Sequence, residues 1–201
     1  MEMKRKSLLL LVLCLLSITL QAQNRVMRKT RANVKTEEVS KYVPLNDTQK
    51  SAIQKAYEQF LTLSDSASYK VVNPEAAAQL RYDAGKAYHK ALMSILTEAQ
   101  KTQYIRLTSA PEVKAKTAYR VSLLREGGNY SEAELEDMSK EIYDYLMLEK
   151  IVYVKDKYDF ATQKNNISRL KQVQPKSLKE SLNIEKQKGL GKVRSGSVMW
   201  N

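Results

Sequence analysis

The side chains best suited to chemistry are few in this sequence of 201 residues. It contains one histidine, His89, and one cysteine, Cys14. Catalysis by a His or Cys dyad, and metal sites built on thiolates or several imidazoles, need more of these residues. A metal site at His89 would depend on carboxylates such as Asp83, so we expect His89 to have a structural or surface role on a helix. We therefore predict no metal ion and no cofactor.

A group of acidic residues is the other candidate for chemistry. Such a group could bind a hard cation or supply a pair of catalytic carboxylates. However, Ser131 and Glu134 have the spacing of a capping box, and acids near a helix start favour the helix dipole. We therefore interpret the group as the solvated start of a helix and predict that the protein is not an enzyme. A carboxylate-dependent hydrolase is the enzymatic alternative. The acids are Glu132, Glu134, Glu136, Asp137, Glu141 and Asp144.

Residues 1–22 have the pattern of a secretory signal peptide. Basic residues at positions 4–6 precede an apolar run over 7–20, and Ala22 is a small residue suited to cleavage. The run is shorter than the ~20 residues that a membrane span needs. We expect a periplasmic or secreted protein after cleavage near Ala22, with retention as an N-terminal anchor as the alternative. Loss of Cys14 would leave no thiol, which suits an oxidising compartment.

The net charge of +12 is concentrated toward the two ends of the chain. Residues 23–41 contain six basic and two acidic residues, and residues 162–201 contain nine and two. Because export would separate the protein from nucleic acid, we predict no nucleic-acid partner. Basic ends favour anionic envelope components or acidic unfolded chains, although they could serve only solubility. The residues expected to contact an anionic partner are Lys186, Lys188, Lys192 and Arg194.

Hydrophobic periodicity predicts an all-α fold. Polar capping patterns begin at Asn46, Asn73, Thr97, Ser131 and Ser177, and apolar residues recur at helical spacing between them. We expect the helix that begins at Thr97 to be short, and a new helix to begin near Pro111 and end at Gly127-Gly128.

The predicted order is a flexible basic lead over 23–41, a helical domain over 42–175, and a last segment over 176–201. The helical domain contains a helical hairpin followed by one long helix from about residue 132 to Pro175. The last segment combines a short amphipathic helix with a disordered basic tail. The whole would be an elongated helical bundle with flexible N- and C-terminal segments.

One motif occurs twice. Leu96-Thr97-Glu98-Ala99-Gln100 matches the LTxxQ pattern in full, and Leu45-Asn46-Asp47-Thr48-Gln49 matches it with Asn46 in place of threonine. On these residues, the segment 44–107 resembles the Spy/CpxP-like family of small exported helical proteins, in which the motif typically occurs twice. Both copies would also serve as ordinary helix caps in an unrelated bundle. The motif residues are Leu45, Gln49, Leu96, Thr97 and Gln100.

The resemblance implies a hairpin-like helical subunit, often paired into a curved dimer, that holds unfolded clients or acts as an envelope-stress adaptor. Twelve tyrosines against two phenylalanines suit a thin two-layer helical assembly whose core is never far from water, and a concave binding face for polypeptide or glycan is the alternative. We therefore expect an exported, non-enzymatic binding protein that is chaperone- or holdase-like or an adaptor. Its partners would be unfolded or dedicated polypeptides, and a homodimer is compatible with the sequence. The alternative is a structural envelope scaffold or protein–protein adaptor that acts through the long helix.

Overall fold

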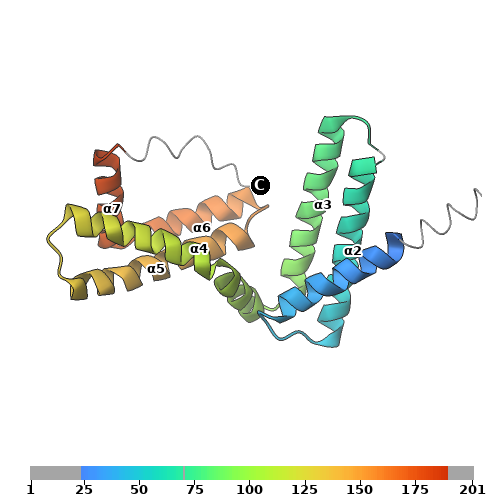
Figure 1. Cartoon of the computed structure of the whole chain (residues 1–201), viewed down its shortest axis with the longest axis horizontal. Coiled ribbons are helices and arrows are strands. Elements are labelled where there is room, and N and C mark those ends of the chain that lie inside the picture. Colours follow the sequence, from blue (N-terminus) through green and yellow to red (C-terminus); the bar gives the residue numbers. More distant parts are fainter. Residues whose placement is uncertain (1–23, 70, 190–201) are drawn as a thin grey trace, which may run out of the picture. The chain divides into compact units, whose positions relative to one another are not determined.

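The computed structural model describes residues 24–69 and 71–189 (Figure 1). This part of the chain is all-α, as predicted, and contains no strand. The expected signal peptide, and Lys192 and Arg194 of the expected tail, lie outside the described residues. The chain divides into two compact units, residues 1–100 and 101–201. None of the helices described between residues 24 and 189 is long and apolar enough to cross a lipid bilayer.

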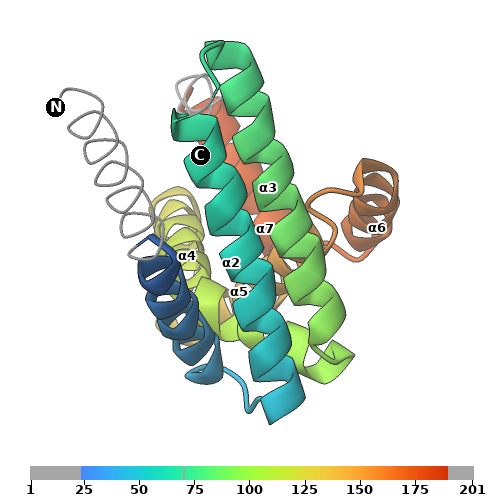
Figure 2. The same cartoon turned by 90° about the vertical axis from the view of Figure 1, so that its right-hand side faces the viewer.

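The first unit contains the predicted helical hairpin. Helices α2 (Asp47–Tyr69) and α3 (Pro74–Ile95) run side by side along their length (Figures 1 and 2). The Oδ1 atom of Asn73 accepts hydrogen bonds from the backbone N–H groups of Glu75 (2.9 Å) and Ala76 (3.1 Å). This N-cap and Pro74 in the first turn fix the start of α3.

The expectation of a flexible lead is wrong for most of that segment, because residues 24–40 form a helix. Ala32, Thr36 and Val39 are fully buried, at 0% exposure. They lie four and three residues apart and so form one helical stripe. The Arg28 guanidinium also pairs with the Asp65 carboxylate of α2 at 3.3 Å. The stripe consists of short side chains, one of them the polar Thr36, between polar and charged residues, which is why hydrophobic periodicity did not reveal it.

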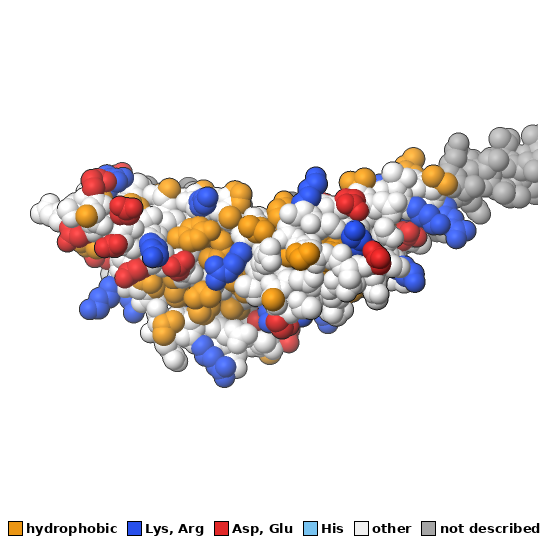
Figure 3. Space-filling view, turned by 90° about the horizontal axis from the view of Figure 1, so that it is seen from below, with side chains coloured by type: hydrophobic (Ala, Val, Ile, Leu, Met, Phe, Trp, Pro, Cys, Tyr) orange, Lys and Arg blue, Asp and Glu red, His pale blue; other side chains and the backbone are white. Residues whose placement is uncertain are grey.

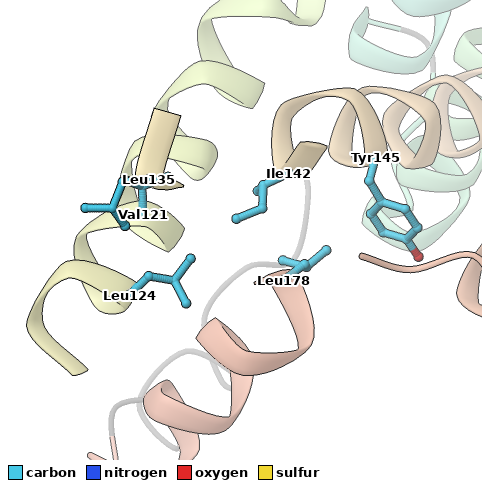
Figure 4. Close-up of a cluster of buried hydrophobic side chains, with 6 residues drawn as sticks. All are labelled: Val121, Leu124, Leu135, Ile142, Tyr145 and Leu178. Atoms are coloured by element: carbon cyan, nitrogen blue, oxygen red, sulfur yellow. The ribbon is translucent and has the colours of Figure 1, made fainter. Parts of the chain in front are cut away.

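The second unit has one hydrophobic core, to which three helices contribute. Helix α4 (Glu98–Gly127) begins in the first unit, and α5 (Glu132–Lys155), α6 (Phe160–Gln172) and α7 (Lys176–Gln187) follow. Figure 4 shows Leu124, Ile142 and Leu178 directed toward one another from α4, α5 and α7. The core cluster consists of Val121, Leu124, Leu135, Ile142, Tyr145 and Leu178.

The long helix predicted to reach Pro175 is instead two helices. Helix α5 ends at Lys155, and α6 begins at Phe160 and packs against α5. The Oδ1 atom of Asp159 accepts from the Thr162 N–H at 3.1 Å, so Asp159 is the N-cap of α6. The β-branched and aromatic residues at 151–154, whose types would also suit a strand, are helical. No glycine or proline lies at this interruption, so the hydrophobic periodicity predicts one uninterrupted helix across it.

Two other predicted helix starts also differ from the structure. Helix α4 continues through Pro111, which is exposed, although proline has no N–H group to donate to the carbonyl of Leu107. The N-cap of α7 is Pro175, without a side-chain cap, rather than Ser177. Ser177 lies in the first turn and donates to the Glu141 carboxylate at 3.4 Å. The predicted end of α4 at Gly127 is confirmed.

Candidate functional site

The first motif copy caps helix α2. The Oδ1 atom of Asn46 accepts from the Gln49 N–H at 2.8 Å, and the Oε1 atom of Gln49 accepts from the Asn46 N–H at 3.2 Å. These two bonds form a complete capping box, with Asn46 in the role that serine or threonine usually has. The motif leucine, Leu45, is half-buried.

The second copy caps helix α4 in the same way. The Oγ1 atom of Thr97 accepts from the Gln100 N–H at 3.2 Å, and the Oε1 atom of Gln100 accepts from the Thr97 N–H at 2.9 Å. The motif leucine, Leu96, is buried with 2% exposure. Each motif therefore orients its glutamine side chain through its own cap.

The two glutamines bind each other. The Nε2 atom of Gln49 donates to the Gln100 Oε1 atom at 2.8 Å and to the Ile95 carbonyl at 3.0 Å. The Nε2 atom of Gln100 donates to the Pro44 carbonyl at 2.6 Å and to the Gln49 Oε1 atom at 3.3 Å. Ile95 and Pro44 each precede a motif leucine, so the arrangement is pseudosymmetric. We call Gln49, Gln100 and the carbonyls of Pro44 and Ile95 the glutamine junction.

The glutamine junction is a structural device rather than a reactive one. An amide supplies two N–H donors and one carbonyl acceptor, and it does not ionise near neutral pH. Both glutamines are half-buried, where an unsatisfied amide would cost free energy. The junction thus connects the start of α2, the end of α3 and the start of α4. Sequence analysis did not identify Pro44 or Ile95, for which position beside the motif was the only signal.

An aromatic group lies between the two helices of the hairpin. The ring centroids of Tyr57 and Tyr88 are 5.0 Å apart, and Phe60 lies 5.4 Å from Tyr57 and 5.8 Å from Tyr88. All three side chains are half-buried. Leu63 and Tyr82 of the same hairpin are 39% and 54% exposed. The hairpin therefore presents apolar and aromatic surface together with tyrosine hydroxyls.

Two of the acidic residues at the start of α5, Glu132 and Glu134, are held in structural contacts. Glu132 pairs with the Arg125 guanidinium at 2.8 Å, and the Glu134 carboxylate accepts from the Ser131 N–H at 2.8 Å. These hydrogen bonds lower the pKa of both carboxyl groups. Figure 3 shows acidic side chains gathered at the end of the second unit where α4 turns into α5. Among residues 24–69 and 71–189, no group of three or more His, Cys, Asp or Glu side chains is placed to hold a metal ion.

The lysines predicted to meet an anionic partner are only partly covered by the structure. Lys186 is exposed at the end of α7. The Lys188 ammonium pairs with the Glu126 carboxylate of α4 at 2.7 Å and lowers its pKa. His89 is half-buried on α3.

Comparisons with protein-family models, with curated proteins and with solved structures found no match for this chain. A functional proposal therefore depends on the geometry of the described residues and on the motif that the junction contains.

Proposed function

We propose that this chain is an exported, non-enzymatic binding protein that holds unfolded polypeptide segments, as proteins of the Spy/CpxP-like kind do. The observation that carries the proposal is the glutamine junction. Contact between two unrelated helix caps is not expected, whereas two copies of a paired motif in one structural unit are expected to contact each other. The reciprocal bonds of Gln49 and Gln100 thus support kinship with a family in which the motif occurs twice.

The hairpin surface is the proposed contact region for clients. Tyrosine combines a large apolar body with a hydrogen-bonding tip, so a tyrosine-rich surface can accept varied polypeptide segments without a fixed register. Leu63 and Tyr82 are exposed on the two helices of this hairpin. Because both side chains are partly exposed, their replacement should affect folding less than replacement of a core residue would.

An aggregation-suppression assay tests the proposal. Mature protein (residues 23–201) is titrated into a chemically unfolded, unrelated client, and light scattering is recorded. We expect suppression near stoichiometric ratios, and a reduced effect for the variant Leu63→Ser/Tyr82→Ser. The matched control is Phe160→Ser, which removes an aromatic side chain that is 79% exposed in the second unit. Absence of suppression at any ratio would contradict the holdase function and favour an adaptor with a dedicated partner.

The electrostatic part of the proposal has a separate test. The basic end of the chain would attract acidic clients or anionic envelope components over distances set by salt screening. Replacement of Lys186, Lys188, Lys192 and Arg194 by glutamine should weaken client association mainly at low salt. An unchanged salt dependence would contradict the electrostatic attraction by the basic end. It would not bear on client contact at the hairpin surface.

A further inference from the structure

A half-enclosed cavity of about 530 Å³ lies within the second unit, between α4, α5 and the start of α6. Its volume falls in the range of about 300–1,000 Å³ that is typical of small-molecule sites. Val113 of α4 and Leu146, Tyr153 and Val154 of α5 provide an apolar lining. Val113 is almost fully buried, at 1% exposure, and therefore lies deep in the packing of this unit. An apolar chain would gain free energy by leaving water for this lining.

The charged groups around the cavity are mainly cations. The Glu112 carboxylate pairs with both neighbouring ammonium groups, Lys116 at 2.8 Å and Lys150 at 2.6 Å. Because one carboxylate pairs with two ammonium groups, Glu112, Lys116 and Lys150 together have an excess positive charge. Lys157, which also lines the cavity, is exposed, and its ammonium lies 5.4 Å from the Tyr158 ring centroid. Lys116 is likewise exposed, so both side chains can turn toward an anion bound in the cavity.

Glu149 is the one carboxylate among the lining residues. It is half-buried, and burial raises the pKa of its carboxyl group against the opposing charges of Lys116, Lys171 and Arg120. The burial of Tyr145 and Tyr153 and the proximity of Glu149 raise the pKa of both phenols. Protonation of Glu149 would therefore increase the affinity of the cavity for an anion that binds beside this carboxyl group.

We propose that this cavity binds a single-chain amphiphile with a carboxylate head. The apolar chain lies against Leu146, Tyr153 and Val154, and the carboxylate pairs with Lys116 and Lys157 at the opening. This site is separate from the hairpin surface of the first unit. If the amphiphile does not bind, the proposed polypeptide-binding function is unaffected. If polypeptides do not bind, the proposed amphiphile site is likewise unaffected.

Calorimetric titration of mature protein with a matched series of ligands tests the proposal. Decanoate, decanol and decylammonium have the same chain length and differ in head-group charge. We expect decanoate to bind at least tenfold more tightly than decanol, and decylammonium to bind more weakly than decanol. Octanoate should bind roughly tenfold more weakly than decanoate, because it buries two fewer methylene groups. Equal affinity for decanoate and decanol, or no binding of decanoate, would overturn the proposal.

Variants locate the binding to this cavity. Val154→Trp should fill the cavity and abolish binding of decanoate, and Lys116→Gln/Lys157→Gln should weaken it about tenfold. The matched control, Lys140→Gln/Lys179→Gln, removes two exposed lysines elsewhere in the same unit and should leave the affinity unchanged. Glu149→Gln removes the repelling carboxylate without changing its size and should tighten binding severalfold at neutral pH. This last variant keeps the test decisive if Val154→Trp fails to fold, since unchanged affinity in Glu149→Gln would place the ligand elsewhere.

Discussion

A double-mutant cycle on the glutamine junction tests whether the two motif copies act as one structural feature. Gln49→Ala removes the acceptor of its own capping box, the donor to the Ile95 carbonyl and both bonds to the Gln100 amide. Gln100→Ala removes the equivalent four interactions at the second motif. A net contribution of about 0.5–1.5 kcal/mol per hydrogen bond gives a loss of about 2–6 kcal/mol for each single variant.

The coupling between the two variants is the informative quantity. The bonds that join the two amides are lost in both single variants, so they are counted twice when the single effects are added. The double variant should therefore lose about 1–3 kcal/mol less than that sum. Ordinary helix caps at separate sites would instead give additive effects within about 0.5 kcal/mol.

Gln49→Glu separates the cap from the junction. Glutamate can still accept from the Asn46 N–H, because capping boxes use glutamate or glutamine. However, the ionised carboxylate has no donor for Gln100 Oε1 or for the Ile95 carbonyl, which lie 2.8 and 3.0 Å from the present amide nitrogen. We expect this variant to lose about 2 kcal/mol at neutral pH although its capping acceptor is retained.

Urea unfolding, followed by circular dichroism, measures these free energies. Because the chain has two compact units, backbone hydrogen exchange in α2 and α3 should accompany it to isolate the first unit. The matched control is Gln79→Ala, which removes only an exposed bond to the Asp83 carboxylate at 3.0 Å. Its effect should stay within about 0.5 kcal/mol. Additive effects of Gln49→Ala and Gln100→Ala, or a neutral Gln49→Glu, would refute the reasoning.

Three further predictions concern the second unit. Glu185→Ala should lower stability by about 3 kcal/mol, because the Arg120 guanidinium would lose its carboxylate partner at 2.6 Å in a poorly exposed position; urea unfolding measures this, and near-neutrality would contradict it. Asp159→Ala should cost about 1 kcal/mol by removing the N-cap of α6, with faster hydrogen exchange confined to that helix. Burial raises the pKa of Glu149, so its ionised form destabilises the folded state above that pKa; Glu149→Gln should raise the urea midpoint at pH 7, and the gain should vanish below about pH 4.

Helices with large apolar residues and recognisable caps could be predicted from the sequence. The capping box of Ser131 and Glu134 and the N-cap at Asn73 are both present, because such caps depend on residues within one turn. The helix over 24–40 was missed because its buried stripe uses small side chains. The interruption at 156–159 was missed because Asp159 caps α6 without a glycine or proline before it. Its position depends on how α6 packs against α5, and local sequence does not encode that packing directly.

The glutamine junction itself lay beyond prediction from spacing. The motif copies are 51 residues apart, and each copy alone predicts only a helix start. Whether two helix starts meet depends on the lengths of α2 and α3 and on the turn between them. The antiparallel hairpin returns the chain to the start of α2, and this return brings the Ile95 carbonyl and Gln100 within reach of Gln49.

The chemistry of the junction explains the residue type at the last motif position. A capping box needs only an acceptor there, and the box at Ser131 uses the carboxylate of Glu134. At Gln49 and Gln100 the same position must accept from its own N-cap and donate to the partner amide and to a carbonyl. Glutamine provides acceptor and donors on a side chain of the same length, whereas ionised glutamate provides acceptors alone. A glutamine pair at this position is therefore the residue choice expected where two capping boxes bind each other.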